Sequence, residues 1–350
     1  MEVKALKFGG LTAKRPIVQG GMGVGVSLSS LAGNVAKCGG IGTISGVHPG
    51  YREADFKENP FRANLRAIGN ELEKAKEIAN GGIIGFNFMT VMNHYEEYVK
   101  EAIAAGADFI VSGAGLPVNL AKYAAGTRAA ILPIVSSARA LKLIVKQWQR
   151  ADRLPDAVVV EGPLAGGHLG YPYGHLVDGT FDTLEDSLVD VVDYVRELEE
   201  KNGVIIPVIA GGGVRSHADM ERLMALGASG VQVGTKFVAT EECDAAPAFK
   251  QAYLRSRKED VQLIESPVGL AARAIRNSFL EKVEKQGRIP VQRCYQCMNH
   301  CKQAETKYCI SQALIDAVQG REGLVFCGAN AYEIEKLSTV EKVMQELCGE

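Results

Sequence analysis

Eight short runs of β-branched and other apolar residues, separated by longer segments with helical periodicity, constrain the fold of this chain most strongly. The runs are nearly continuous in apolar residues, as in strands covered on both faces, and do not alternate as half-exposed strands do. Repeated strand and helix units of this kind build a parallel sheet. The predicted strands are residues 16–20, 41–45, 83–88, 109–113, 131–136, 157–161, 206–210 and 230–233.

The segments between the runs carry apolar stripes. In one of them the apolar residues repeat at three- and four-residue intervals, which predicts a helix packed on the sheet through Tyr95, Tyr98, Val99, Ala102 and Ile103. The alternation of strands and helices stops at Glu241, where the chain becomes polar and helical. We therefore expect an α/β fold, a (β/α)8 TIM barrel over residues 1–245, with a C-terminal helical, cysteine-containing lobe over residues 246–350 at one mouth of the barrel.

Composition narrows the classes of function. The 350 residues are 47% hydrophobic and 23% charged with a net charge of −2, which is typical of a compact globular protein. Nucleic acid is not an expected partner, because phosphate backbones are bound by clustered Lys and Arg. No run approaches the roughly 18 apolar residues of a membrane span, and the first residues lack the pattern of a secretory signal. We expect a cytoplasmic protein.

The carboxyl ends of the predicted strands are rich in glycine, and active sites of parallel barrels lie at these ends. After the seventh and eighth strands, residues 211–213 and 233–235 would let the backbone approach a phosphate closely. A helix expected to begin near Ser216 would add its positive end. These features predict a phosphate site, with a simple tight turn as the alternative interpretation.

His168 is the one histidine that follows a predicted strand within a glycine-rich loop. At this position its imidazole can face a ligand, which favours a catalytic acid or base over a solvated surface histidine. The remaining histidines fit solvated or structural roles better: His48, His94, His175, His217 and His300.

Four cysteines follow the spacing C-x2-C-x3-C-x7-C near the C-terminus: Cys294, Cys297, Cys301 and Cys309. Structural zinc usually joins two CxxC pairs separated by a dozen or more residues, whereas a compact run of three with a nearby fourth favours a [4Fe–4S] cluster. Zinc is the second interpretation and unliganded thiols the third. The other cysteines are expected to be isolated: Cys38, Cys243, Cys327 and Cys348.

Several segments resemble nitronate monooxygenase and the enoyl-ACP reductase II flavoproteins over roughly the first 280 residues. They read PIVQGGMG, GFNFM, VEGPLAGGH, VIAGGGV and GASGVQVGTKF. The resemblance implies an FMN-containing barrel in which His168 is the base. It implies FMN contacts at Gly21, Met22, Gly23, Asn87, Glu161, Gly166, Gly167, Gly211, Gly212, Gly213, Gly234 and Thr235.

A narrower resemblance covers almost the whole chain. The segments SPVGLAARAI and GLVFCGAN, with the four cysteines, are similar to the cluster-containing branch of FabX-type acyl-ACP dehydrogenases and isomerases. The gap before Cys309 is shorter than in that branch, so Cys309 is the least secure of the four ligands. A cluster near FMN would serve as an electron conduit to an external partner, because reduced FMN must be reoxidised. The alternative is that the cluster only braces the C-terminal lobe, and its distance from FMN decides between the two.

Three functions remain open at this point. The first is dehydrogenation, isomerisation or enoyl reduction of acyl thioesters on acyl-carrier protein (ACP) or CoA in fatty acid biosynthesis. The second is a nitronate monooxygenase that oxidises alkyl nitronates with O2, a reaction that needs no cluster. The third is a flavin-binding regulatory or storage protein, in which His168 would have no catalytic role. We further expect a homodimer.

Overall fold

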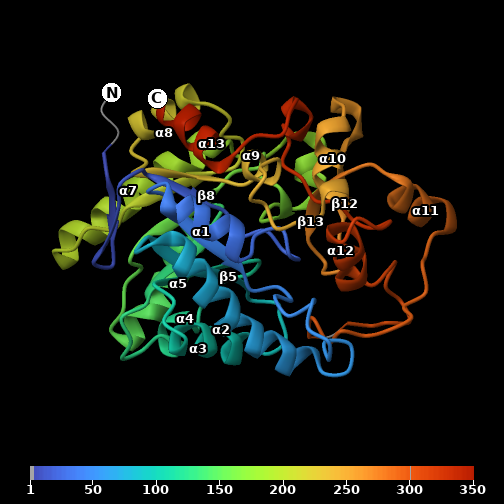
Figure 1. Cartoon of the computed structure of the whole chain (residues 1–350). Coiled ribbons are helices and arrows are strands. Elements are labelled where there is room, and N and C mark those ends of the chain that lie inside the picture. The colour runs from blue at the N-terminus through green and yellow to red at the C-terminus, as the bar shows by residue number, and fades with distance from the viewer. Residues whose placement is uncertain (1–3, 300) are drawn as a thin grey trace.

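A closed barrel of eight parallel strands forms the centre of the molecule, as a computed structural model shows (Figure 1). The structure describes residues 4–299 and 301–350, so His300 lies outside it. Each strand pairs with the next along the chain, and the last returns to the first, which confirms the predicted TIM barrel. The barrel strands are β3 (Ile17–Gln19), β4 (Ile41–Ser45), β5 (Ile83–Met89), β6 (Phe109–Gly113), β7 (Ala130–Val135), β8 (Val158–Glu161), β10 (Val208–Gly211) and β11 (Gly230–Val233).

Helices follow the strands and pack against their outer faces. The helix predicted from the stripe that begins at Tyr95 is α3, which buries Tyr98, Val99 and Ala102. The helices up to the last barrel strand are α1 (Ser29–Lys37), α2 (Pro60–Ala79), α3 (Tyr95–Ala104), α4 (Leu120–Tyr123), α5 (Ala138–Trp148), α6 (Tyr173–Asp178), α7 (Leu184–Asn202) and α8 (His217–Ala225), with a 3-10 turn at Gln149–Ala151.

Local sequence signals fix several helix ends. The Asn59 side chain accepts the backbone N–H of Arg62 at the start of α2, where Pro60 occupies the first turn. Thr183 and Asp186 form a capping box at the start of α7, which ends at Gly203 in a left-handed conformation. These signals set where α2 begins and where α7 begins and ends.

A small hairpin closes the amino end of the barrel. Strands β1 (Leu6–Phe8) and β2 (Leu11–Ala13) pair antiparallel, and their side chains belong to the core inside the barrel. The Phe8 ring lies 6.1 Å from the Phe109 ring of β6, edge to face. The hairpin was not among the predicted strands. It leaves the carboxyl end as the open mouth.

The chain after the barrel covers that mouth and adds strands that were not predicted. Strand β13 (Ala271–Ile275) pairs with β12 (Val261–Glu265) and also with β9 (Gly167–Leu169), which lies in the loop after β8. The helices are α9 (Thr235–Val238), α10 (Pro247–Arg255), α11 (Ser278–Gln286), α12 (Ile310–Val318) and α13 (Val340–Cys348), with 3-10 turns at Lys258–Asp260 and Ala331–Glu333.

Contacts run across the predicted boundary near residue 245. Helix α13 returns to α1 and α8, as the red end of the chain shows in Figure 1, while α11 and α12 lie on the opposite side of the molecule. The division into a barrel domain and a C-terminal lobe remains a prediction. Among the described residues, no helix is both long and apolar enough to cross a membrane.

Candidate active site

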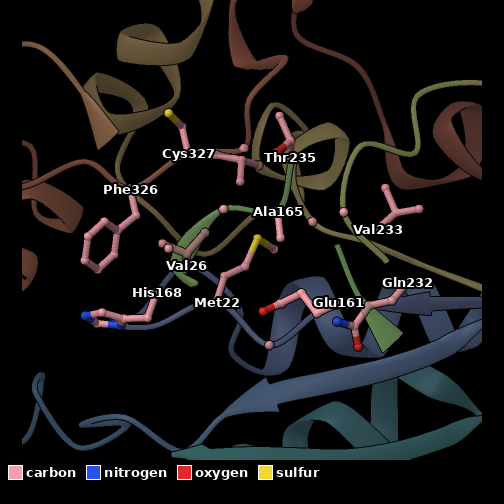
Figure 2. Close-up of a pocket in the computed structure, with 18 of the residues that line it drawn as sticks. Met22, Val26, Glu161, Ala165, His168, Gln232, Val233, Thr235, Phe326 and Cys327 are labelled. Carbon is pink, nitrogen blue, oxygen red and sulfur yellow. The ribbon is translucent and has the colours of Figure 1, made fainter. Parts of the chain in front are cut away.

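A cavity of about 340 Å³ opens at the carboxyl ends of the barrel strands. It brings together residues from the loops after β3, β5, β8, β10 and β11, together with residues 326–330 from the C-terminal region. Every residue predicted to contact the cofactor lines this cavity, except Gly211, which lies at the end of β10 beside Gln232. Figure 2 shows Met22, Glu161, His168 and Thr235 in this cavity.

Gly21 and Gly212 are among the cavity glycines that leave no room for a side chain. A Cβ on Gly21 would lie 2.3 Å from the Cβ of Asn87. Gly212 has a φ of +100°, and a Cβ there would lie 2.9 Å from the carbonyl oxygen of Gly162. The sequence therefore needs glycine at both positions to bring these loops together, and their backbone is left open to a ligand.

One corner of the cavity gathers backbone from four loops. Gly212 packs on residues 162–165, and Gly213 lies beside Leu164. Gly328 lies against the hydroxyl of Thr235, and the next residue, Ala329, donates its backbone N–H to Leu164. Helix α8 follows nearby and begins at its cap Ser216. This corner has the glycine-rich loops and helix start that the sequence predicted for a phosphate site, so the residues present fit a flavin phosphate.

His168 lies in β9 and is half-buried. Its Nε2 is 2.8 Å from the Oγ of Ser266, and its ring packs edge to face on Phe326 with the centroids 5.0 Å apart (Figure 2). Burial lowers the pKa of His168 to about 4. The imidazole is therefore neutral at pH 7 and has a lone pair for accepting a proton.

Glu161 ends strand β8 and lines the cavity with His168. Burial raises the pKa of its carboxyl group to about 7. Its backbone carbonyl accepts the hydroxyl of Tyr171, 3.2 Å away. A group that is partly protonated at neutral pH can donate or accept a hydrogen bond next to a bound ring.

A second cavity, of about 890 Å³, adjoins the first. Its walls come from the loops after β6 and β7, from β9, from the turn between β12 and β13, and from Met298 and residues 301–307. The residues that line both cavities are Ala114, Ile134, Glu161 and His168. A ligand can therefore reach His168 from either cavity.

The four predicted cluster ligands are neighbours in space. Burial raises the pKa of the Cys297 thiol to about 11, and the charges of Cys309, Cys301 and Cys294 add to the rise. The segment that carries them is tied to the barrel where the Asn93 backbone N–H donates to Cys297 at 3.2 Å. In the described part of the chain, however, no three His, Cys, Asp or Glu side chains are arranged to hold a metal ion. The thiols as placed do not form a ligand cage.

Sequence reasoning missed the C-terminal residues of the site. Ser266, Phe326 and Cys327 all reach the region of His168 or the first cavity. Ser266 stands in the SPVG segment and Cys327 in the GLVFCGAN segment, which carried only the resemblance to the narrower branch. These two segments were the available signal for the C-terminal residues of the site, but the sequence did not show where their side chains lie in the fold.

A comparison with models of protein families shows which family the chain belongs to. The model of the family described as "Nitronate monooxygenase" matches residues 4–350. The chain belongs to the nitronate monooxygenase family. A probable nitronate monooxygenase of Staphylococcus saprophyticus is 25% identical over 308 residues, which span 81% of this chain and 82% of that protein. Members of this family are oxidoreductases, which is the class of enzyme that the predictions gave.

Solved structures share the fold. FabK from Thermotoga maritima superposes with a TM-score of 0.72 at 23% identity, and the match covers 96% of this chain and 92% of FabK. A nitroalkane oxidase from Streptomyces ansochromogenes gives a TM-score of 0.66 at 20% identity, with 96% and 95% covered. At these identities the likeness establishes the fold of this family member and leaves its substrate open.

Proposed function

We propose that this family member is an FMN-dependent oxidoreductase that acts on acyl thioesters of ACP or CoA, as in the FabX-type branch. The observation that carries the proposal is the placement of neutral His168 where the glycine-lined cavity meets a larger second cavity. The first cavity suits a flavin nucleotide, and the second gives a long substrate access to the same imidazole. The reaction is dehydrogenation with isomerisation, or enoyl reduction.

The residues for FMN come from the loops that meet at the first cavity. Its phosphate would be held by backbone groups of residues 212–213 and 234–235, and its ring would lie among Met22, Asn87 and Glu161. FMN supplies hydride transfer to or from the substrate carbon when it is bound. All other steps in the proposal belong to side chains of the chain itself.

His168 removes the proton next to the thioester carbonyl. If Nε2–H donates to the hydroxyl oxygen of Ser266, the lone pair lies on Nδ1. Nδ1 takes the α proton while a hydride leaves the β carbon, so a carbon–carbon double bond forms. In the enoyl product the imidazole can then take a proton from the γ carbon and return it to the α carbon, so the double bond moves to the β,γ position with no net gain or loss of atoms or electrons, which is the isomerisation.

The size of the second cavity favours a thioester over a small nitronate. About 890 Å³ is close to the upper end of the usual range for ligand pockets, roughly 1,000 Å³. Apolar residues such as Leu116, Ile134 and Met298 line it, which suits an acyl chain. An alkyl nitronate would fill only a small part of this space.

The alternative is a nitronate monooxygenase that uses O2. The family description and the names of its Staphylococcus relatives support this reaction. His168 would again act as the base, because the carbon next to a nitro group is also acidic. The two hypotheses therefore share a site and differ in substrate and in electron acceptor.

A [4Fe–4S] cluster at Cys294, Cys297, Cys301 and Cys309 is the least supported part of the proposal. Its support is the spacing of the cysteines and their closeness in space. Because the thiols as placed do not form a ligand cage, we assign no step of the reaction to the cluster. The external electron partner, the homodimer and the cytoplasmic location also remain predictions.

Two assays, one without oxygen and one with it, separate the two candidate functions. Decanoyl-ACP added to the oxygen-free protein should bleach the flavin absorbance, because the substrate reduces the flavin. Propionate 3-nitronate should cause little oxygen consumption. Fast oxygen consumption without bleaching by decanoyl-ACP would establish the alternative. In either case His168→Ala should retain flavin and lose turnover by about 10²- to 10⁴-fold, and normal turnover would exclude His168 as the base.

A further inference from the structure

A buried arginine lies behind the corner of the first cavity that fits a flavin phosphate. Arg273 lies in β13 and is only 8% exposed. Its Nη2 donates to the carbonyl oxygen of Pro163 at 3.0 Å, and its Nη1 donates to that of Ala165. No carboxylate pairs with it among the described residues. An uncompensated buried charge is costly, which calls for an explanation beyond packing.

The two carbonyls orient two backbone donors. In a trans peptide the C=O and N–H groups point in opposite directions. The peptide bonds that follow Pro163 and Ala165 are trans, so the N–H groups of Leu164 and Gly166 point away from the guanidinium. Both residues line the first cavity, and neither N–H has an acceptor within the described ranges. Arg273 thus polarises two free donors at the phosphate corner.

Two Lys or Arg side chains of the described residues line the cavity, and both already have partners. Arg215 lines the cavity but lies 3.3 Å from a carboxylate oxygen of Asp219 and 3.3 Å from one of Glu333. Lys236 also lines it and lies 3.0 Å from Glu346. The charge that remains at this corner, among the residues described, is that of Arg273.

We infer that Arg273 is the counter-charge of the flavin phosphate, acting through the backbone N–H groups of Leu164 and Gly166. It is a positioning residue, because the guanidinium does not line the cavity itself. The inference rests on the proposed FMN cofactor and goes beyond it, since it assigns the phosphate's electrostatic partner to the C-terminal region. FMN carries a negatively charged phosphate that riboflavin lacks, so a comparison of the affinities for the two flavins tests the inference.

The experiment compares the affinities of the flavin-free full chain for FMN and for riboflavin. Wild type should prefer FMN. Arg273→Gln should lower the ratio of the two affinities by about tenfold, because the charge behind the two donors is lost. Arg273→Lys should lower it by about threefold, because an ammonium keeps the charge but cannot bridge both carbonyls. The control is Arg276→Gln, which removes an arginine of the same segment that is half-exposed and paired with Glu281.

The outcomes are distinguishable. An arginine that only braces the loop would weaken FMN and riboflavin by the same factor, and that result would overturn the inference. If Arg273→Gln does not fold, an unchanged ratio in Arg273→Lys overturns it equally well. A wild-type chain without preference for FMN over riboflavin also overturns it. A wild-type chain that binds neither flavin refutes the proposed cofactor instead.

Discussion

The Nε2 of His168 lies 2.8 Å from the Oγ of Ser266, although the two residues are 98 positions apart in the chain. His168 is in β9, whose register places it opposite Ala272 of β13. Ser266 is in the turn between β12 and β13 and is only 5% exposed. The proposed base of the barrel is therefore held by the C-terminal hairpin, and the orientation of its ring depends on that hairpin.

Replacing Ser266 tests this dependence. We expect Ser266→Ala to lower turnover by about tenfold to a hundredfold, because the imidazole loses the partner that fixes its ring and its tautomer. Flavin content should not change, since Ser266 does not line the first cavity. Ser266→Thr retains the hydroxyl and should recover most of the rate. Steady-state kinetics with decanoyl-ACP, the proposed substrate, and the flavin spectrum measure both effects, and full activity in Ser266→Ala would disprove the positioning role.

The barrel could be predicted from the sequence because its signal is local and repeated. All eight predicted barrel strands are present, with ends that differ by two residues at most. The location of Gly212 and His168 at the mouth could be predicted because they follow strands, and a parallel barrel places all such positions at one mouth. Ser266 and Arg273 could not, because their roles depend on which segment β13 pairs with, and pairing between distant segments leaves no periodic signal.

Gly212→Ala should abolish tight flavin binding. The added Cβ would lie 2.9 Å from the Gly162 carbonyl oxygen and 3.1 Å from the Ala165 nitrogen, and the φ of +100° is unfavourable for alanine. The loop must shift, and the phosphate corner shifts with it. Fluorescence titration of the flavin-free protein with FMN measures the loss.

Gly203→Ala is the matched control for backbone strain. Gly203 also has a positive φ, +65°, but a Cβ there meets nothing within 4 Å. This variant should lose about 1 kcal/mol of folding stability and keep wild-type affinity for FMN. Equal losses of FMN affinity in both variants would mean that strain, and not the geometry of the site, governs flavin binding.

The cysteine hypothesis has a direct chemical assay. Protein purified without oxygen should contain iron and acid-labile sulfide, and Cys297→Ala should remove both, because a cubane cluster needs its thiolate ligands. Cys38→Ala is the control, since Cys38 lies at the end of α1 and is half-buried apart from the other four. Zinc in place of iron would refute the cluster, and metal-free protein would indicate unliganded thiols.

His48 should make the stability of the protein depend on pH. It is only 4% exposed, its Nε2 is 2.8 Å from the Ser311 hydroxyl, and burial lowers its pKa from 6.5 to about 4. Between these two values the unfolded chain binds a proton that the folded chain does not, so the free energy of unfolding must fall as the pH falls.

From pH 7 to pH 5 the contribution of His48 is about 2 kcal/mol. His48→Asn should remove it, and asparagine tolerates the left-handed backbone that His48 adopts, with a φ of 50°. His94→Asn is the matched control, because His94 is also left-handed, with a φ of 58°, but its side chain is 37% exposed. Denaturant unfolding at both pH values should show a smaller loss of stability in His48→Asn than in wild type or His94→Asn. The same loss in all three proteins would mean that His48 is protonated in the folded chain and that its burial does not exclude the charge.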